Sequence, residues 1–213
     1  MKQSSIFIFS LLSLGINAFG QVDSLASKNF ALEFAVDYGK ILTIPLNFET
    51  KIEGAVGIKF QTKYEVLTEI GYSELTPQDA IKNGSYQSKG VYYRLGLTYG
   101  GEILPRNLLS IGVMYGASNF EDSGTVIIQS TIWDDFDGSF ERLNLTATWF
   151  EIIMITEKHM SNNLALGAKF RFRHLTNFIN EYNPEVIAIP GYGKAFNSNV
   201  PAVNLYVKYR LEF

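Results

Sequence analysis

The last eleven residues, VNLYVKYRLEF, alternate strictly between two kinds of side chain. In an extended chain one face would carry Val203, Leu205, Val207, Tyr209, Leu211 and Phe213, and the other Asn204, Tyr206, Lys208, Arg210 and Glu212. A period of two is typical of a β-strand with one apolar face. The length matches the roughly 9–11 residues that a tilted strand needs to cross a bilayer.

The same alternation recurs in seven earlier segments: residues 30–38, 51–60, 63–72, 90–99, 108–118, 142–149 and 163–173. Tyr and Phe, which favour strands, number 12 and 16, whereas Pro numbers only 6. The pattern predicts an all-β fold, an antiparallel up-and-down transmembrane β-barrel of about eight strands. Ten strands are possible if residues 119–139 and 175–201 supply two more.

The connections between these segments alternate in length. Short ones lie near residues 61–62, 100–107 and 156–163, and long ones span residues 39–51, 74–85, 119–139 and 175–201. Outer-membrane barrels have short periplasmic turns, long extracellular loops and both termini on the periplasmic side. This sorting favours such a barrel over the alternative, a soluble lipocalin-like barrel whose apolar residues line a ligand cavity.

The first twenty residues have the features of a secretory signal peptide. Lys2 precedes an apolar stretch from Ile6 to Ile16, and the small residues Ala18 and Gly20 follow. We expect cleavage after Gly20, which leaves residues 21–213 as one barrel domain in the cell outer membrane. The chain has no cysteine, so neither a lipid-attachment cysteine nor a disulfide is expected.

The polar faces of the segments carry opposite charges in different parts of the chain. Closing the sheet would bring early acidic strands beside late basic ones, and an eight-stranded barrel has an interior that side chains fill. Because buried charges need partners, we predict a packed polar network in the lumen, formed by Glu33, Asp37, Glu65, Glu69, Arg94, Arg142, Lys169, Arg171, Arg173, Lys208 and Arg210.

Aromatic residues recur at the ends of the segments, where the two membrane interfaces would lie. We expect interfacial girdles, because amphipathic rings favour the headgroup level. The residues concerned are Tyr38, Tyr72, Tyr115 and Trp149 at one set of ends and Tyr64, Tyr99 and Phe213 at the other.

With Tyr209, Leu211 and the terminal Phe213 at alternate positions, the chain resembles the small single-chain outer-membrane barrels of Gram-negative bacteria. That resemblance implies recognition of the last strand by the barrel-assembly machinery. The motifs VDYGK (36–40), KGVYYRLGLTYG (89–100), IGVMYGAS (111–118), TWFE (148–151) and IPGYGK (189–194) resemble an uncharacterised Bacteroidota family of outer-membrane barrels, itself a domain of unknown function. This second resemblance implies no activity.

The two histidines are the first candidates for a catalytic site. His174 lies toward the same end as Ser118, Ser123 and Glu181, which supplies the elements of a nucleophile, a base and an orienting carboxylate. No motif joins them, and His174 has the lipid-facing parity of its strand. An ordinary interfacial histidine is therefore favoured, and we predict no catalytic residue.

The long loops offer two further candidates. Asp134, Asp135 and Asp137 lack the spacing of a calcium loop, so a solvated loop is favoured and no metal or cofactor is expected. Four loop aromatics, Trp133, Tyr182, Tyr192 and Phe196, could form a surface for an extracellular glycan or protein. A loop that packs as a lid over the barrel mouth explains the same residues and is favoured over that surface.

The sequence therefore leaves several functions open. The favoured one is a non-enzymatic envelope or surface-binding protein in contact with outer-membrane lipid and lipopolysaccharide. A narrow channel or small-solute porin is the first alternative, and a lipid-modifying enzyme that depends on His174 is the second. The balance of 18 basic and 21 acidic residues excludes a nucleic-acid partner bound by charge.

Overall fold

The computed structural model describes residues 30–39, 49–77, 80–128, 136–178 and 181–213. The predicted signal peptide, residues 1–20, lies outside this range. Within the described residues no helix is long and apolar enough to cross a membrane.

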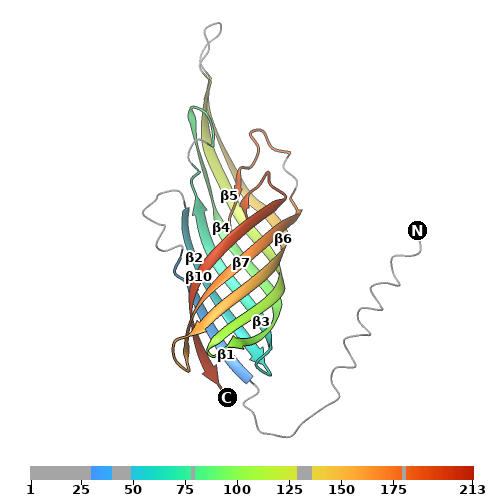
Figure 1. The fold of residues 1–213 in the computed structure, drawn as a ribbon. Helices are drawn as coiled ribbons and strands as arrows, with labels where there is room; N and C mark the ends of the chain where they lie inside the picture. Colours follow the sequence, from blue (N-terminus) through green and yellow to red (C-terminus); the bar gives the residue numbers. More distant parts are fainter. Residues whose placement is uncertain (1–29, 40–48, 78–79, 129–135, 179–180) are drawn as a thin grey trace, which may run out of the picture.

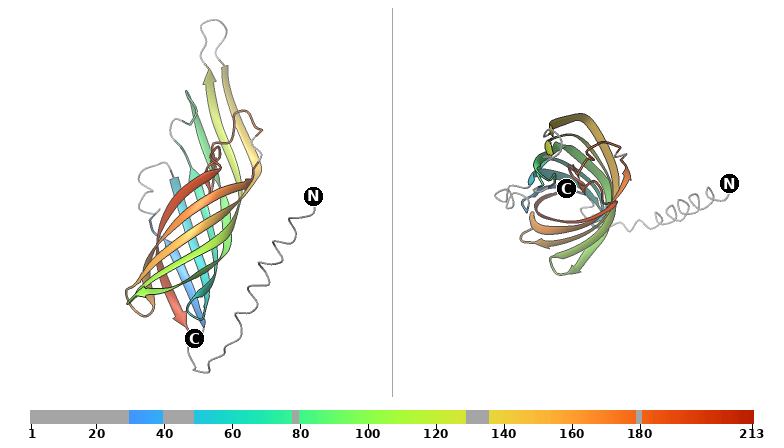
Figure 2. Two further views of the ribbon diagram at one scale, coloured as in Figure 1. Left: turned by 45° about the vertical axis from the view of Figure 1, so that its right-hand side comes forward. Right: turned by 90° about the horizontal axis from the view of Figure 1, so that it is seen from above.

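Eight antiparallel strands form a closed ring in the order β1-β10-β7-β6-β5-β4-β3-β2, which confirms the predicted barrel (Figures 1 and 2). They are β1 (Phe30–Asp37), β2 (Glu49–Phe60), β3 (Tyr64–Leu75), β4 (Gly84–Leu104), β5 (Asn107–Ile128), β6 (Phe136–His159), β7 (Leu164–Asn177) and β10 (Asn199–Glu212). The ring closes where Glu33 of β1 pairs with Arg210 of β10. Every other pair in the ring joins two strands that follow one another along the chain, if the short β8 and β9 are left out. These two strands lie between β7 and β10 in the sequence and do not belong to the ring.

The ten-stranded alternative is wrong. Residues 119–128 continue β5, and residues 136–139 belong to β6, so the described part of this region lengthens two barrel strands and adds none. In the last long connection, β8 (Ala188–Ile189) and β9 (Gly193–Lys194) pair only with each other, in a separate two-stranded sheet.

The barrel is apolar outside and charged inside. Exposed apolar side chains occur on every strand of the ring; they include Phe34, Val56, Ile70, Leu95, Val113, Ile152, Phe172 and Val203. The alternate positions are buried and mostly polar, as in β3, where Glu65 and Glu69 are at most 4% exposed. This orientation is the opposite of a lipocalin-like barrel, so the alternative fold is wrong.

The two ends of the barrel differ. At the end that we call the short-turn end, tight turns connect β2 to β3, β4 to β5 and β6 to β7, and the C-terminus lies there (Figure 1). Gln61, Thr62 and Arg106 make these turns with φ values of 49°, 59° and 66°.

At the opposite, long-loop end, β4, β5 and β6 extend beyond their neighbours (Figure 2). Pairing of β3 with β4 stops at Leu75 and Ser88, and pairing of β6 with β7 stops at Thr148 and Asn177. Pairing of β5 with β6 continues to Ile128 and Phe136. We call the part of these strands beyond the ring the protruding sheet.

A bulge in β6 reverses the side-chain parity of that strand. Between the pairs Phe120–Leu145 and Asp122–Arg142, β5 contributes one residue and β6 contributes two. Asn144, one of those two, adopts a φ of 58°, in the left-handed region that Asn tolerates better than most residues. Arg142 and Leu145 consequently both point inward.

The bulge overturns one expectation. Leu145, Ala147 and Trp149 were expected on the lipid face, with Trp149 in an interfacial girdle. Trp149 is instead completely buried in the lumen, because the extra residue moves every following position of β6 to the opposite face. A strict period of two cannot reveal such an insertion.

Candidate functional site

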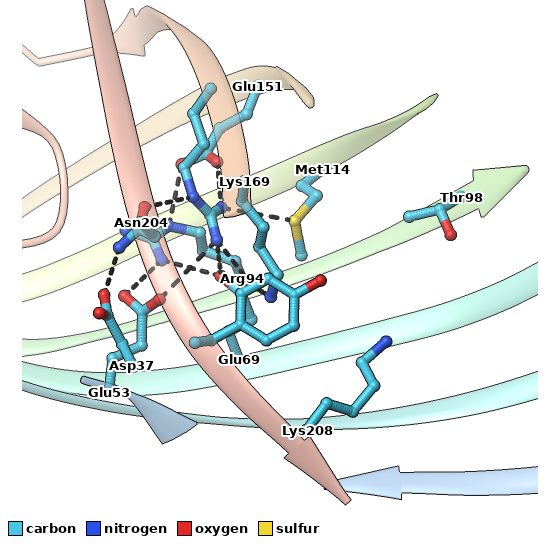
Figure 3. Close-up of polar contacts among 12 residues, drawn as sticks. Asp37, Glu53, Glu69, Arg94, Thr98, Met114, Glu151, Lys169, Asn204 and Lys208 are labelled. Carbon is cyan, nitrogen blue, oxygen red and sulfur yellow. Dashed lines mark hydrogen bonds and ion pairs between the residues drawn. The ribbon is translucent and has the colours of Figure 1, made fainter. Parts of the chain in front are cut away.

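The inward faces of all eight strands meet in a lumen filled with charged side chains (Figure 3). Alternation along each strand turns every second side chain inward, and many of these side chains are polar or charged. The contacts fall into a central cluster, a lower cluster toward the short-turn end and a pair near the long-loop end.

Glu69 of β3 is the hub of the central cluster. Its two carboxylate oxygens accept hydrogen bonds from Arg94 Nη1 at 2.9 Å, Lys169 Nζ at 2.6 Å and Arg171 Nη2 at 2.7 and 2.8 Å. Glu69, Arg94 and Arg171 have fully buried side chains. One carboxylate thereby joins β3, β4 and β7 across the barrel.

Two more carboxylates complete the central cluster. Glu53 Oε2 accepts from Lys51 Nζ at 2.8 Å, Arg94 Nη1 at 2.8 Å and the Tyr92 hydroxyl at 2.7 Å. Glu151 lies 2.9 Å from Arg94 Nε and 2.7 Å from Arg171 Nη1. The buried Trp149 indole also donates to Glu151, at 2.6 Å.

The side of the cluster near β10 is closed by an amide. Arg171 Nε donates to Asn204 Oδ1 at 2.8 Å, and Asn204 Nδ2 donates in turn to Asp37 Oδ2 at 2.5 Å. A cavity of about 10 Å³ beside these residues is lined by Asp37, Lys169 and Tyr206, among others. It has room for about one water molecule, not for a continuous aqueous path.

Lys208 organises the lower cluster. Its ammonium group lies 2.6 Å from Glu33, 2.5 Å from Glu157 and 3.5 Å from Glu65. Arg210 Nε donates to the second oxygen of Glu33 at 2.6 Å. The Tyr206 hydroxyl donates to Glu157 at 2.6 Å, so this cluster ties β10 to β1 and β6.

Near the long-loop end, Arg142 and Asp122 form a two-point ion pair. Arg142 Nε and Nη2 donate to the two oxygens of Asp122 at 2.7 and 2.5 Å. The Tyr86 hydroxyl also donates to Asp122, at 2.9 Å. Burial raises the pKa of Tyr86 to about 12, so this phenol keeps its proton over the ordinary pH range.

Above the central cluster, a loop fills the barrel mouth. We call residues 184–195 the plug segment; it includes β8 and β9. Val186, Ile189 and Tyr192 are completely buried and pack in one apolar group with Tyr92 and Trp149. The Tyr192 and Trp149 rings are 5.7 Å apart.

Hydrogen bonds from the barrel hold the backbone of the plug segment. Arg94 Nη2 donates to the Gly191 carbonyl at 2.8 Å, and Arg173 Nη1 donates to the Tyr192 carbonyl at 2.6 Å. Arg142 Nη1 donates to the Pro184 carbonyl at 2.6 Å. Gly191 has a φ of 78°, and a Cβ there would lie 2.4 Å from the Tyr92 ring, so both the turn and the close approach require glycine.

The predicted lumen residues lie in the interior in three groups. Glu33, Glu65, Lys208 and Arg210 belong to the lower cluster, and Arg142 lies beside the plug segment. The remaining six, Asp37, Glu69, Arg94, Lys169, Arg171 and Arg173, belong to the central cluster.

Sequence reasoning missed several lumen residues. In the predicted second strand, the alternation already placed Lys51 and Glu53 on the polar face, but they were not included in the network. Glu151 and Glu157 share the parity of Trp149, but the bulge made that face look lipid-exposed. Tyr206 had been placed on the polar face but not in the network, and Tyr92 had been assigned to neither face. Each lies over a glycine of the neighbouring strand, Gly71 and Gly167 respectively.

The loop aromatics do not form one surface. Tyr192 is completely buried in the plug, whereas Tyr182 and Phe196 are 42% and 59% exposed. Including Tyr192 in a binding surface was wrong, because its ring packs on Trp149. Trp133, Asp134 and Asp135 lie outside the described residues.

The structure does not bring together the residues that were weighed for a catalytic site and set aside. Ser118 is 3% exposed and faces the lumen, whereas His174 is exposed on the outer side of β7. His174 Nδ1 instead lies 2.9 Å from Asn199 Oδ1. Tyr209 and Phe213, which were predicted to form a barrel-assembly signal, are exposed on β10 and at its end.

Comparison with protein families gives one match over almost the whole chain. A family model described as "Domain of unknown function (DUF6048)" matches residues 3–213. The comparison with curated proteins found no match.

Solved structures share the fold at low sequence identity. A major outer membrane protein from Thermus thermophilus is 11% identical, with a TM-score of 0.50; the alignment covers 86% of this chain and 98% of that one. Ail of Yersinia pestis, solved with the heparin analogue sucrose octasulfate, is 11% identical over 86% and 97%, with a TM-score of 0.43. The N-terminal β-barrel domain of Pseudomonas aeruginosa OprF is 12% identical over 85% and 97%, with a TM-score of 0.38.

Proposed function

The chain belongs to the family described as Domain of unknown function (DUF6048), and we propose that it is a non-conducting, non-enzymatic outer-membrane barrel that displays the protruding sheet at the cell surface. Its strands would span the bilayer with the short-turn end in the periplasm. Residues 1–20 would direct export, and residues 21–213 would form the mature domain.

The observation that carries this proposal is the sealed lumen. Fully buried Arg94, Glu69 and Arg171 cross the middle of the barrel, and the plug segment covers them on the long-loop side. An ion that passed through the lumen would have to break several charge-assisted hydrogen bonds. Each broken bond would leave a buried charge without a partner. A porin role therefore has no support in this geometry.

The outer surface supports the membrane location. Apolar residues such as Leu97, Ile111 and Ile152 are 60–65% exposed on the barrel wall. A contiguous exposed surface of this kind is unfavourable in water and favourable in lipid. We propose contact with outer-membrane lipid and lipopolysaccharide, and insertion by the barrel-assembly machinery acting on Tyr209, Leu211 and Phe213.

The protruding sheet supports a binding role at the surface. A groove of about 820 Å³ lies at its base, lined by hydroxyl, amide, carboxylate and aromatic side chains, among them Ser85, Gln87, Phe140 and Glu141. Hydroxyl-rich surfaces with aromatic rings suit glycans and polar peptides. We propose an extracellular glycan or protein as the class of ligand.

The test is cell fractionation combined with gel mobility and surface proteolysis. The proposal expects the protein in the outer membrane, a faster-migrating band in unboiled samples, and cleavage in intact cells at a protease site inserted after Ile128. A matched site inserted after Thr62 should be cleaved only in lysed cells. Soluble periplasmic protein, or cleavage of both sites in intact cells, would contradict the proposal.

A further inference from the structure

The short-turn end of the barrel contains a second cavity, apart from the protruding sheet. Its volume is about 660 Å³, and its lining includes inward-facing Ala31, Lys59, Leu108 and Arg210. Lys63 and Arg106 lie at its rim. Arg210 also belongs to the lower cluster around Lys208, through its ion pair with Glu33.

Lys59 is an unusual residue in this lumen. It is only 5% exposed, yet it makes no hydrogen bond or ion pair with the part of the chain that the structure describes. By contrast, Lys208 and Lys169 each contact a carboxylate at 2.6 Å. The Lys59 ammonium nitrogen is not one of the fully buried atoms; it opens on the cavity, where an anion can pair with it.

Arg210 presents a second unsatisfied donor at the same cavity. Its Nε donates to Glu33, but its Nη2 is buried and has no hydrogen-bond partner among the described residues. Arg210 Nη1 lies 3.7 Å from Glu212 Oε1, and a turn of the guanidinium group toward the cavity would bring Nη2 to a carboxylate bound there. Two basic side chains, Lys59 and Arg210, thus line one cavity.

Two carboxylates, Glu102 and Glu212, line the cavity, and each has a partner: Glu102 accepts from the Arg106 backbone N–H, and Glu212 lies 3.7 Å from Arg210 Nη1. The carboxylates deeper in the lumen are engaged as well. Both oxygens of Glu33 accept from Lys208 and Arg210. One oxygen of Glu65 accepts from Thr98 at 3.1 Å, and Glu157 Oε1 is shared by Lys208 and Tyr206. None of these three carboxylates forms an ion pair with Lys59 in the described part of the chain, and Lys59 faces the cavity.

We propose that the cavity at the short-turn end binds the free carboxylate of a periplasmic peptide or polymer end, held by Lys59 and Arg210. Ala31 and Leu108, which are 9% and 8% exposed, form an apolar wall for a small side chain next to that carboxylate. A lipid headgroup is disfavoured as the occupant, because the ring of strands separates the cavity from the surrounding leaflet. Assignment to the periplasm rests on the orientation proposed above.

The test uses the full chain in detergent micelles and a fluorescently labelled Ala-Ala-Ala peptide with a free C-terminal carboxylate. Fluorescence anisotropy should detect saturable binding, and the amidated form of the same peptide should bind at least about tenfold more weakly. Inorganic phosphate should compete only weakly, because it lacks the apolar group. Equal binding of the two peptides, or no binding, would overturn the proposal. Tighter binding of phosphate than of the carboxylate peptide would also overturn it.

Variants separate binding from folding. Lys59→Met should keep the heat-shifted gel band and weaken peptide binding at least about tenfold, whereas Lys59→Arg should retain binding within about threefold. Lys89→Met, at an exposed position on β4, is the matched control and should bind like the wild type. If Lys59 serves only the internal charge balance, Lys59→Met will bind the peptide normally, and that result would refute the site. None of these measurements depends on membrane orientation, so they can fail while the proposed surface function stands.

Discussion

Individual residues in the lumen differ in how many partners depend on them. Glu69 accepts from three cations and is fully buried, whereas among the described residues Glu121 pairs with Lys89 alone, at 3.0 Å, and both of those side chains are more than 40% exposed. The energetic value of an ion pair follows burial more than distance, because solvent screens exposed pairs.

Glu69→Gln should therefore destabilise the barrel strongly. Removing the charge leaves Arg94, Lys169 and Arg171 with too few counterions, which typically costs about 3–5 kcal/mol. Glu121→Gln is the matched control and should cost less than about 1 kcal/mol. Urea unfolding in lipid vesicles, followed by tryptophan fluorescence, measures both. Equal losses would show that the central cluster is not the main internal support.

Glycines beneath tyrosines provide a second test at this scale. A Cβ on Gly71 would lie 2.3 Å from the Tyr92 ring, whereas a Cβ on Gly101 would have no atom within 4 Å. Gly71→Ala should cost about 1–3 kcal/mol through overpacking, and Gly101→Ala should cost little. The same urea titration applies; a tolerant Gly71→Ala would mean that the Tyr92 hydroxyl does not have to reach Glu53.

At the scale of elements, β6 shows which structural features could be predicted from the sequence and which could not. Strand positions and the parity of seven segments followed from alternation, since each inward or outward position is set by a period of two. The bulge at Asn144 broke that rule through one extra residue, and with it the placement of Trp149. The plug contacts of Arg94 and Arg173 are long-range, so no local pattern encodes them.

Substitutions at Asn144 test the bulge. Asn144→Gly should be neutral or slightly stabilising, because glycine adopts the observed φ of 58° freely. Asn144→Val should cost about 1–2 kcal/mol, because a β-branched residue is strained there. The temperature at which the heat-shifted gel band is lost gives the thermal stability of both variants. Identical transition temperatures for Gly and Val would place Asn144 outside a left-handed conformation.

The plug segment is an element that the ring does not need for closure. All eight strands pair without β8 and β9, so replacing residues 185–194 with a short Gly-Ser linker should leave a folded, heat-modifiable barrel. Its removal exposes Trp149 and should shift the tryptophan emission to longer wavelength. A variant that fails to fold would show that the plug contributes to the core and not only to the seal.

At the scale of the whole molecule, two features act together. Lipid solvates an apolar exterior, and paired charges replace the hydrophobic core that a soluble domain of this length would have. A barrel of eight strands leaves only enough interior for side chains. The rigid, sealed cylinder then holds the protruding sheet at one end and the Lys59 cavity at the other.

The most direct test of this account is conductance of the purified protein in planar lipid bilayers. Insertion should be verified in the same preparation by the heat-shifted band. The account predicts no discrete current steps for the wild type, and none for the variant without residues 185–194, because Glu69, Arg94 and Arg171 still close the lumen. Reproducible steps from the wild-type protein would contradict the sealed lumen and favour a channel.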